Sequence, residues 1–475
     1  MMSLSGTTVS CAAIGAKAAG NKTVSGQSGS GLSGGSSSGG GGNRFARELA
    51  GAPLGSLTVR KWRLENGLEI ITVPDPGARS VSYLTVYRVG SRDENAAAGE
   101  TGLAHLFEHL MFTGTGRGKA NGDFDEQIEG MGGSSNAQTS YDFTSYIDEV
   151  PPDGLDRAIR LEAERMVNLD LAAKQVTNER DVVVEERLGT VEDSVDGMLD
   201  EMVWQQAFHA HPYRWPIIGL MADIKAVTKE KALAFYRRHY APNRALIVVA
   251  GRFDEAAALG AMATAYGALA AAPEAAVNPA APERAPAAVV RSRIARPVAA
   301  DRLVVGYPAP ALGDGDRAAF DVINELLTGG PSSRLYRLLV VAREISSSVN
   351  GDVAPTRDPG LWCLWVQMTK GNDAERAEDA IVRELTRVAR EPIPAAELAG
   401  AKNRLETRFW EDLSSSRGRA EALGHFDVTT GDFRKLLERS AAYAAVSPAD
   451  VARVARAYLE PGARSVVIAS PAVRP

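Results

Sequence analysis

Two histidines and a glutamate that could together bind and use a metal ion lie within one short segment, His105-Leu106-Phe107-Glu108-His109. On a helix, a spacing of four places the two imidazoles one turn apart and about 40° from each other around the axis. Both rings can then reach one cation at the roughly 2.0–2.1 Å that a zinc–nitrogen bond requires. Glu108 flanks the same face, where its carboxylate can accept a proton from an attacking water molecule. The segment therefore predicts a catalytic metal site on a helix.

A catalytic zinc ion usually has three protein ligands and one open position, so a third ligand must come from elsewhere in the chain. The acidic segment 176–194, VTNERDVVVEERLGTVEDS, offers Glu179, Glu185 and Glu186. Glu179 and Glu186 are seven residues apart and share a helix face, whereas Glu185 points about 100° away from Glu186. Such a pair suits one ligand and one carboxylate that orients a ligating histidine. Spacing alone equally allows a solvated acidic face, so both interpretations stay open at this point.

The elements that must position these residues are predicted from hydrophobic periodicity and turn residues. Asn66-Gly67 joins two alternating segments within 58–75 and predicts a β-hairpin. The same reasoning predicts the remaining elements: strands within 80–94 and 134–150 and at the end of 228–251, and helices at 101–115, at 121–133, over 154–210 and at the start of 228–251. The histidine pair thus lies on a helix that follows a strand and precedes a strand pair.

Composition divides the chain into two folded blocks. Residues 1–50 form a Gly/Ser-rich tail that cannot bury a core, and 268–289 form an Ala/Pro-rich linker. The expected domains are therefore 51–267, which carries the metal site, and 290–475.

The second block repeats the pattern of the first. Residues 447–470 share the helix–Tyr–Pro–strand pattern of 228–251, and FDVINELLTGG at 320–330 echoes HLFEHLMFTGT at 105–115. In that register the three predicted metal-site residues of the first block are replaced by Phe320, Ile323 and Asn324. The second domain should therefore keep the fold without the ligands, which predicts one zinc ion per chain.

Charge and cysteine content exclude several classes of protein. The 475 residues carry a net charge of −6, and the sequence pI is near 5.7, so no nucleic-acid partner is expected. The only cysteines, Cys11 and Cys363, cannot build a disulfide framework or a thiolate metal site. No apolar stretch approaches the length of a membrane span, and the tail lacks the apolar core of a secretory signal. The compartment, cytoplasmic or periplasmic, stays open.

Three segments, HLFEHLMFTGT, GGSSNAQTSYDFTSYIDEVP and NERDVVVEE, resemble the pitrilysin-type (M16) zinc metallopeptidases. The H-x-x-E-H order is the inverzincin signature. The resemblance covers nearly all of 57–475 and extends to the beta-type mitochondrial processing peptidase and to bacterial heterodimeric members. It implies an α+β fold of two homologous LuxS/MPP-like metallohydrolase domains, each a sheet packed with helices. It also implies that Glu186 is the third ligand and that Glu179 orients a ligating histidine.

The resemblance further implies how a peptide is bound. The strand that begins near Ser134 should present an open edge, to which an extended peptide adds by main-chain hydrogen bonds. Asn136 and Ala137 would then lie near the scissile bond. Without the resemblance, alternation alone would favour an ordinary internal strand.

One departure from the family pattern concerns the second domain. Many relatives place an Arg and, seven residues later, a Tyr where they polarise the substrate carbonyl. Here Val340 and Ser347 occupy these positions. We therefore expect a zinc-dependent endopeptidase for extended or unfolded peptides, whose homologous partner subunit supplies the missing pair. The alternative is a non-catalytic, core-type structural subunit of a larger complex.

Overall fold

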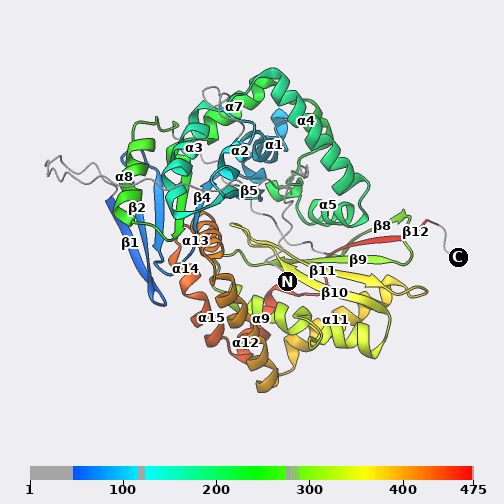
Figure 1. The fold of residues 1–475 in the computed structure, drawn as a ribbon. Coiled ribbons are helices and arrows are strands. Elements are labelled where there is room, and N and C mark those ends of the chain that lie inside the picture. The colour runs from blue at the N-terminus through cyan, green and yellow to red at the C-terminus, as the bar shows by residue number, and fades with distance from the viewer. Residues whose placement is uncertain are drawn as a thin grey trace, which may run out of the picture.

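The computed structural model describes residues 47–115, 124–273, 280, 283, 286 and 288–472, and it contains two sheets with helices packed against them (Figure 1). Residues 1–46 of the predicted tail and much of the predicted linker lie outside this part of the chain. The predicted end of the tail is wrong, because residues 47–50 belong to strand β1. This strand is mostly exposed, and its backbone pairing with β2 holds it in place, which hydrophobic patterning does not predict.

The first half contains strands β1 (Arg47–Leu54), β2 (Leu57–Arg63), β3 (Glu69–Pro74), β4 (Val81–Tyr87), β5 (Ser134–Thr139), β6 (Thr144–Val150) and β7 (Ala245–Gly251). Its helices are α1 (Leu103–Leu110), α2 (Phe124–Glu129), α3 (Leu155–Asn168), α4 (Ala173–Arg187), α5 (Val195–Ala207), α6 (Met221–Lys225), α7 (Lys229–His239) and α8 (Glu255–Tyr266).

The second half contains strands β8 (Val290–Arg296), β9 (Arg302–Ala309), β10 (Ser346–Val353), β11 (Gly360–Met368) and β12 (Ser465–Pro471). Its helices are α9 (Arg317–Thr328), α10 (Arg334–Tyr336), α11 (Ala374–Arg390), α12 (Ala395–Asp412), α13 (Ser416–Thr430), α14 (Arg434–Leu437), α15 (Arg439–Ala445) and α16 (Pro448–Tyr458), with a π-helical turn η8 (Arg337–Ala342).

The predicted hairpin at Asn66-Gly67 is confirmed as β2 and β3, which pair in antiparallel register. Gly67 has φ of +89°, a left-handed conformation that a residue with a side chain rarely adopts. The full sheet has the order β1-β2-β3-β7-β4-β6-β5, so β5 lies at one edge. This edge position is the one expected for the strand containing Asn136 and Ala137.

The predicted duplication is visible in the strand topology. The second sheet has the order β10-β11-β9-β12-β8, which reproduces β5-β6-β4-β7-β3 of the first sheet. The single parallel pair falls at the same place in both, β3 with β7 and β8 with β12. In α9, Phe320 and Ile323 are fully buried, and Asn324 accepts a hydrogen bond from Trp362 Nε1 at 2.7 Å. The second half therefore fills the equivalent of the metal site with side-chain packing.

Each half covers one face of the other half's sheet. Helix α5 packs Leu199, Val203 and Trp204 against the second sheet, in one buried cluster with Val304 and Val467. Conversely, α13 of the second half packs on β4 and β7 of the first sheet, as its orange ribbon shows in Figure 1. Each sheet is therefore covered on both faces, because helices of its own half pack on the opposite face.

Helices α5 and α13 each pack on the sheet of the other half, and each contact includes a glycine at a point of close approach. A Cβ added at Gly424 of α13 would lie 2.7 Å from Leu84, and one at Gly306 of β9 would lie 2.9 Å from Val203 of α5. A larger residue at either position would have to displace a neighbouring side chain in a close-packed interior.

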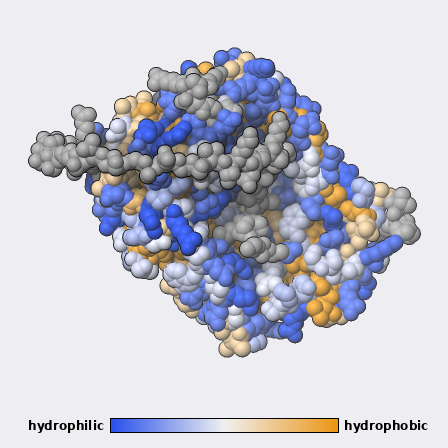
Figure 2. Space-filling model, in the orientation of Figure 1, coloured by the Kyte–Doolittle hydropathy of each residue, from blue (hydrophilic) through white to orange (hydrophobic). Residues whose placement is uncertain are grey.

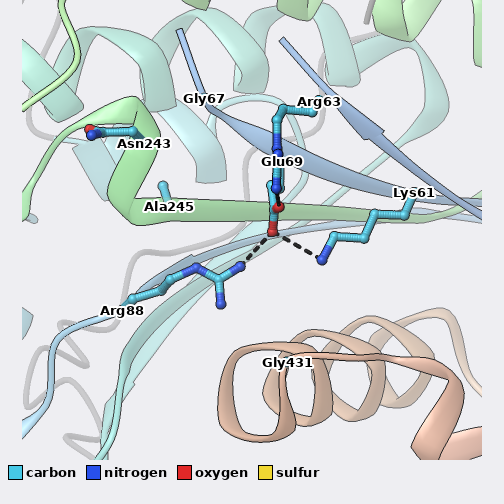
Figure 3. A pocket seen from close by; sticks show the side chains of 8 residues that line it. All are labelled: Lys61, Arg63, Gly67, Glu69, Arg88, Asn243, Ala245 and Gly431. Atoms are coloured by element: carbon cyan, nitrogen blue, oxygen red, sulfur yellow. Dashed lines mark hydrogen bonds and ion pairs between the residues drawn. The ribbon is translucent and has the colours of Figure 1, made fainter. Parts of the chain in front are cut away.

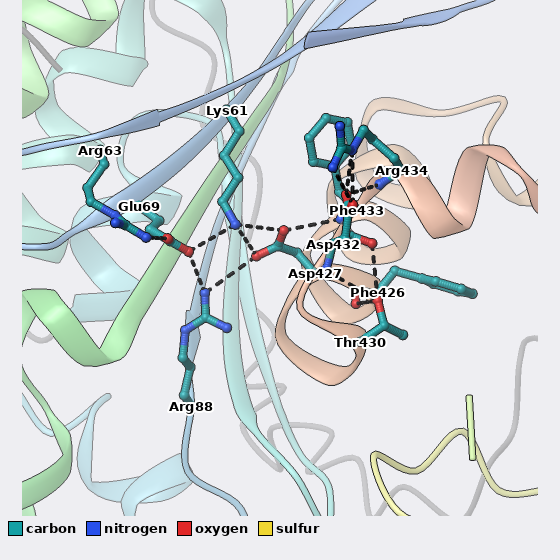
Figure 4. A network of polar contacts seen from close by, with 10 residues as sticks. All are labelled: Lys61, Arg63, Glu69, Arg88, Phe426, Asp427, Thr430, Asp432, Phe433 and Arg434. Atoms are coloured by element: carbon teal, nitrogen blue, oxygen red, sulfur yellow. Dashed lines mark hydrogen bonds and ion pairs between the residues drawn. The ribbon is translucent and has the colours of Figure 1, made fainter. Parts of the chain in front are cut away.

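A charged network joins α13 to the first sheet (Figure 4). Lys61 Nζ lies 2.8 Å from both carboxylate oxygens of Asp427 and 3.0 Å from Glu69. Arg88 Nη2 lies 2.6 Å from Glu69 and 3.4 Å from Asp427. Because Asp427 is completely buried, its charge requires these partners. The network therefore fixes the position of the second half on the first sheet.

The surface is mainly polar on the face shown in Figure 2, with hydrophobic residues in small groups. Among the described residues, the exposed large hydrophobic side chains lie on separate elements: Leu49, Val167, Val182, Val341 and Trp410. The helices of this part of the chain include none with the length and apolar character of a membrane span.

Candidate metal centre

Helix α1 is held in place by contacts at its N-terminus and near its middle. It begins after Gly102, whose φ of +89° favours glycine, and a Cβ there would lie 2.6 Å from the backbone oxygen of Ile218. The buried carboxylate of Glu94 accepts hydrogen bonds from the backbone N–H groups of Gly102 at 2.9 Å and Ala104 at 2.8 Å. Near the middle of the helix, Tyr146 donates to the carbonyl of Phe107 at 2.8 Å. These contacts fix where the imidazoles point.

The predicted ligands converge, although Glu186 lies on a different helix. Its Oε2 lies 3.3 Å from His109 Nε2 and 3.8 Å from His105 Nε2. One ligand atom from each of the three residues lies within 4.8 Å of the others. A tetrahedral zinc ion with bonds of roughly 2.0–2.2 Å separates its ligand atoms by about 3.3–3.5 Å. The observed separations therefore match a zinc site to within a small side-chain adjustment.

The environment of His105 also fits a metal. The side chain is fully buried, and neither ring nitrogen has a hydrogen-bond partner within the described residues. Burial lowers the pKa of His105 to about 4, and the neighbouring His109 acts in the same direction, so the ring is neutral at pH 7. A buried neutral imidazole without a hydrogen bond is costly, but it is the form that binds a cation.

Glu186 carries the charge that such a cation needs. Burial raises the pKa of Glu186, but the hydrogen bond with His109 and the electrostatic interactions with His105 and His109 outweigh it and lower the pKa overall. Glu186 is thus ionised at neutral pH. Two imidazoles and one carboxylate form a donor set typical of catalytic zinc.

The other two candidate glutamates lie differently. Oε2 of Glu179 lies 3.9 Å from Nδ1 of His109, on the opposite side of the ring from Glu186. Burial raises the pKa of Glu179. Glu185 is exposed and contributes no atom to the cluster. The predicted separation of Glu185 from the shared face of Glu179 and Glu186 is therefore confirmed by position.

Glu108 lies between the two histidines in the sequence of α1, and a residue that sequence reasoning missed anchors its carboxylate. Its Oε2 accepts a hydrogen bond of 2.6 Å from Oγ1 of Thr139, the last residue of β5, and both side chains are buried. One feature of the sequence points to Thr139. It follows Ala137 by two residues, so the two side chains share one face of the strand.

The remaining predicted residues lie at the β5 edge and in the second half. Asn136 is half-buried and Ala137 is buried, and both pair with β6 on the inner side of β5. Val340 lies in the π-helical turn η8, and Ser347 lies on β10 with its hydroxyl 3.3 Å from the carbonyl of Gln367. Neither side chain can act as a cationic or phenolic donor.

Two of the other histidines, His211 and His425, have structural contacts. His211 Nε2 lies 3.0 Å from Asp358, a contact between the two halves, and its Nδ1 accepts from the backbone of Tyr213 at 3.1 Å. His425 stacks on Phe143 with ring centroids 4.4 Å apart.

A pocket of about 450 Å³ lies away from these residues, at the end of the first sheet (Figure 3). It is lined by Lys61, Arg63, Gly67, Glu69, Arg88, Asn243, Ala245 and Gly431. Its cationic side chains cannot hold a metal ion, and Figure 3 shows Glu69 already paired with Lys61 and Arg88. The pocket therefore does not contain the cluster of His105, His109 and Glu186.

Known proteins are similar in sequence to this one over most of its length. Residues 69–219 match the family described as Insulinase (Peptidase family M16), and residues 226–405 match the Peptidase M16 inactive domain. Zinc protease PqqE of Helicobacter pylori is 29% identical over 86% of this chain and 92% of its own length. An uncharacterized zinc protease of Streptomyces coelicolor is 28% identical over 85% of this chain and 87% of its own.

A solved structure agrees with the fold. The crystal structure of a protease from Helicobacter pylori superposes with a TM-score of 0.82 at 27% identity, and the match covers 90% of this chain and 100% of that one. The two matched family segments together span more than half of the chain. By fold, duplication and sequence, the chain belongs to peptidase family M16.

Proposed function

We propose that this chain is a zinc-dependent endopeptidase that hydrolyses extended or unfolded peptides. The observation that carries the proposal is the convergence of His105, His109 and Glu186, with the buried Glu108 on the same helix as the two histidines. Three protein ligands leave one position open, which distinguishes a catalytic zinc site from a structural one. The names of the relatives, zinc proteases of the same family, support the same chemistry.

The chemistry that zinc supplies when bound is polarisation of a carbonyl oxygen and a lower pKa for a coordinated water. The chain's own residues would do the rest. Glu108 accepts the proton of the attacking water and passes it to the leaving amine. Glu179 orients the ring of His109 through its Nδ1 side.

The edge strand would bind the substrate. Because β5 lies at the end of the first sheet, its outer backbone groups can pair with an extended peptide. Asn136 and Ala137 would lie beside the scissile bond in that arrangement. An extended conformation is required, so folded substrates would be poor ones.

We further propose that the chain is the metal-bearing subunit of a heterodimer. Relatives polarise the substrate carbonyl with an Arg and a Tyr, and Val340 and Ser347 cannot replace them chemically. A homologous subunit that carries the pair would complete the site. Full peptidase activity of the purified chain alone would contradict this part of the proposal.

The test combines metal analysis with hydrolysis of a mixed peptide library. We expect one zinc ion per chain, and cleavage that increases when a homologous chain carrying the Arg and Tyr is added. Glu108→Gln should retain zinc and lose turnover by at least about 10²–10⁴-fold, because it keeps the shape of the side chain but removes the base. A zinc-free wild type without cleavage under either condition would instead favour a structural subunit.

A further inference from the structure

The hydroxyl of Thr139 links the substrate strand to the carboxylate of Glu108. The oxygen–oxygen distance is 2.6 Å, which lies in the range of a charge-assisted hydrogen bond to a carboxylate. The exposed fraction is 0% for Thr139 and 1% for Glu108. In such a dry environment a hydrogen bond to an ionised group is stronger and more directional than at the surface.

The position of Thr139 is fixed by its own strand. It is the last residue of β5 and pairs with Thr144 of β6, and the turn is closed by a hydrogen bond from Ser140 N to the carbonyl of Phe143 at 2.8 Å. Ala137 and Thr139 share the buried face of β5, while Asn136 and Gln138 are half-buried on the other. Because strand pairing holds Thr139 in place, a movement of the Glu108 carboxylate would lengthen or break the hydrogen bond between them.

The hairpin end is also tied to the second half. Asp142, in the turn after Thr139, is buried and accepts hydrogen bonds from Tyr213 at 2.9 Å and from Arg92 at 3.1 Å. The backbone N–H of Arg357, which belongs to the second half, donates to the same carboxylate at 2.9 Å. The two halves thus hold the turn from both sides.

We propose that Thr139 is a positioning residue that sets the orientation of Glu108 relative to a peptide bound on β5; this inference rests on the proposed function. One oxygen of the carboxylate accepts the threonine hydrogen bond. This contact restrains rotation of the carboxylate and so limits the directions in which its second oxygen can point. The same strand would pair with the substrate backbone. Glu108 and the scissile bond are therefore held in a fixed relative position, because β5 contacts Glu108 through Thr139 and would also pair with the substrate.

The decisive variant is Thr139→Val, which keeps the branched shape and removes the hydroxyl. We expect kcat to fall about 10–100-fold, because a misplaced catalytic group loses that order of rate. KM and zinc content should stay within about twofold of the wild type, since the strand and the ligands are intact. Thr139→Ser keeps the hydroxyl and should restore most of kcat.

The matched control is Thr144→Val in the neighbouring strand. Thr144 is also fully buried and pairs with Thr139, but its hydroxyl donates to the carbonyl of Val89 at 2.9 Å. Both variants lose one buried threonine hydroxyl, so a general packing effect would lower kcat in both. A loss of kcat confined to position 139 supports a specific action on Glu108.

Wild-type kcat in a folded, zinc-loaded Thr139→Val would overturn the inference. If this variant does not fold, Thr139→Ala tests the same hydroxyl, and wild-type kcat there has the same meaning. An inactive wild type would contradict the proposed function itself, whereas an active wild type with unaffected variants would contradict only the role of Thr139.

Discussion

Oε2 of Glu186 lies 3.3 Å from Nε2 of His109, although the two residues belong to different helices separated along the chain by the β5–β6 hairpin. Helix α4 packs against α1, and this contact brings the carboxylate to the histidine pair. The adjacent Glu185 is exposed on the same helix. The convergence of these side chains therefore depends on how two helices pack as well as on the motif within one of them.

Glu186→Gln should weaken zinc binding strongly, because the amide retains the size of the side chain but loses the negative charge. The loss should exceed the roughly 10–100-fold that follows removal of a group outside the ligand set. Glu185→Gln is the matched control and should bind zinc as the wild type does. The measurement is competition for zinc with a chromophoric chelator, and equal affinities for both variants would remove Glu186 from the ligand set.

Glu179→Gln should reduce zinc affinity or turnover about 10–100-fold, the usual effect of losing a carboxylate that orients a ligating histidine. The carboxylate lies 3.9 Å from Nδ1 of His109, the ring nitrogen that faces away from Glu186, so the proposed role is to orient the ring. Asp181→Asn, in an exposed pair with Arg180 on the same helix, serves as the control. Identical zinc titrations and kcat values for the two variants would show that Glu179 has no such role.

Asp427→Asn should lower the free energy of unfolding by about 3–5 kcal/mol, because it breaks a buried ion pair and leaves Lys61 short of a charge partner. Asp432→Asn is the control, since that carboxylate pairs only with the exposed Arg434 among the ion pairs of the described residues. Urea denaturation of both variants measures the difference. Comparable unfolding midpoints would mean that the network contributes little to the contact between the halves.

His425 should make stability depend on pH. Burial lowers the pKa of His425 from 6.5 to about 4, so between these values the unfolded chain binds a proton that the folded chain does not. Stability contributed by the neutral ring is therefore complete above about pH 6.5 and is lost as the pH falls toward 4. His425→Phe should keep the stacking on Phe143 and flatten this part of the profile.

Denaturant unfolding at pH 7 and pH 5 measures the effect on both proteins. The wild type should lose more stability between these two values than His425→Phe does. Equal losses of stability in the wild type and in His425→Phe would show that the His425 ring binds its proton equally in the folded and unfolded states.

The parts of the fold that sequence could predict are those with local signals. Asn66-Gly67 fixes the β2–β3 hairpin, and the four-residue spacing of His105 and His109 predicts their shared helix face. The choice of Glu186 could not come from spacing, because Glu179 shares its face. It depends on the angle at which α4 crosses α1, which is a tertiary property.

Three features had no local signal strong enough to predict them. Strand β1 is largely exposed and is held by backbone pairing, so hydrophobic patterning does not predict it. The sequence does not show which sheet α5 or α13 packs on, because both sheets present chemically similar apolar faces. The contact between Thr139 and Glu108 joins residues whose proximity appears only once β5 lies beside α1.

The reciprocal placement of α5 and α13 has a consequence for how the chain could be divided. A single half folding by itself would leave one face of its sheet without its helix. Cutting the connecting segment should accordingly yield two fragments that remain associated, and that reassemble from separate expression only when both are present.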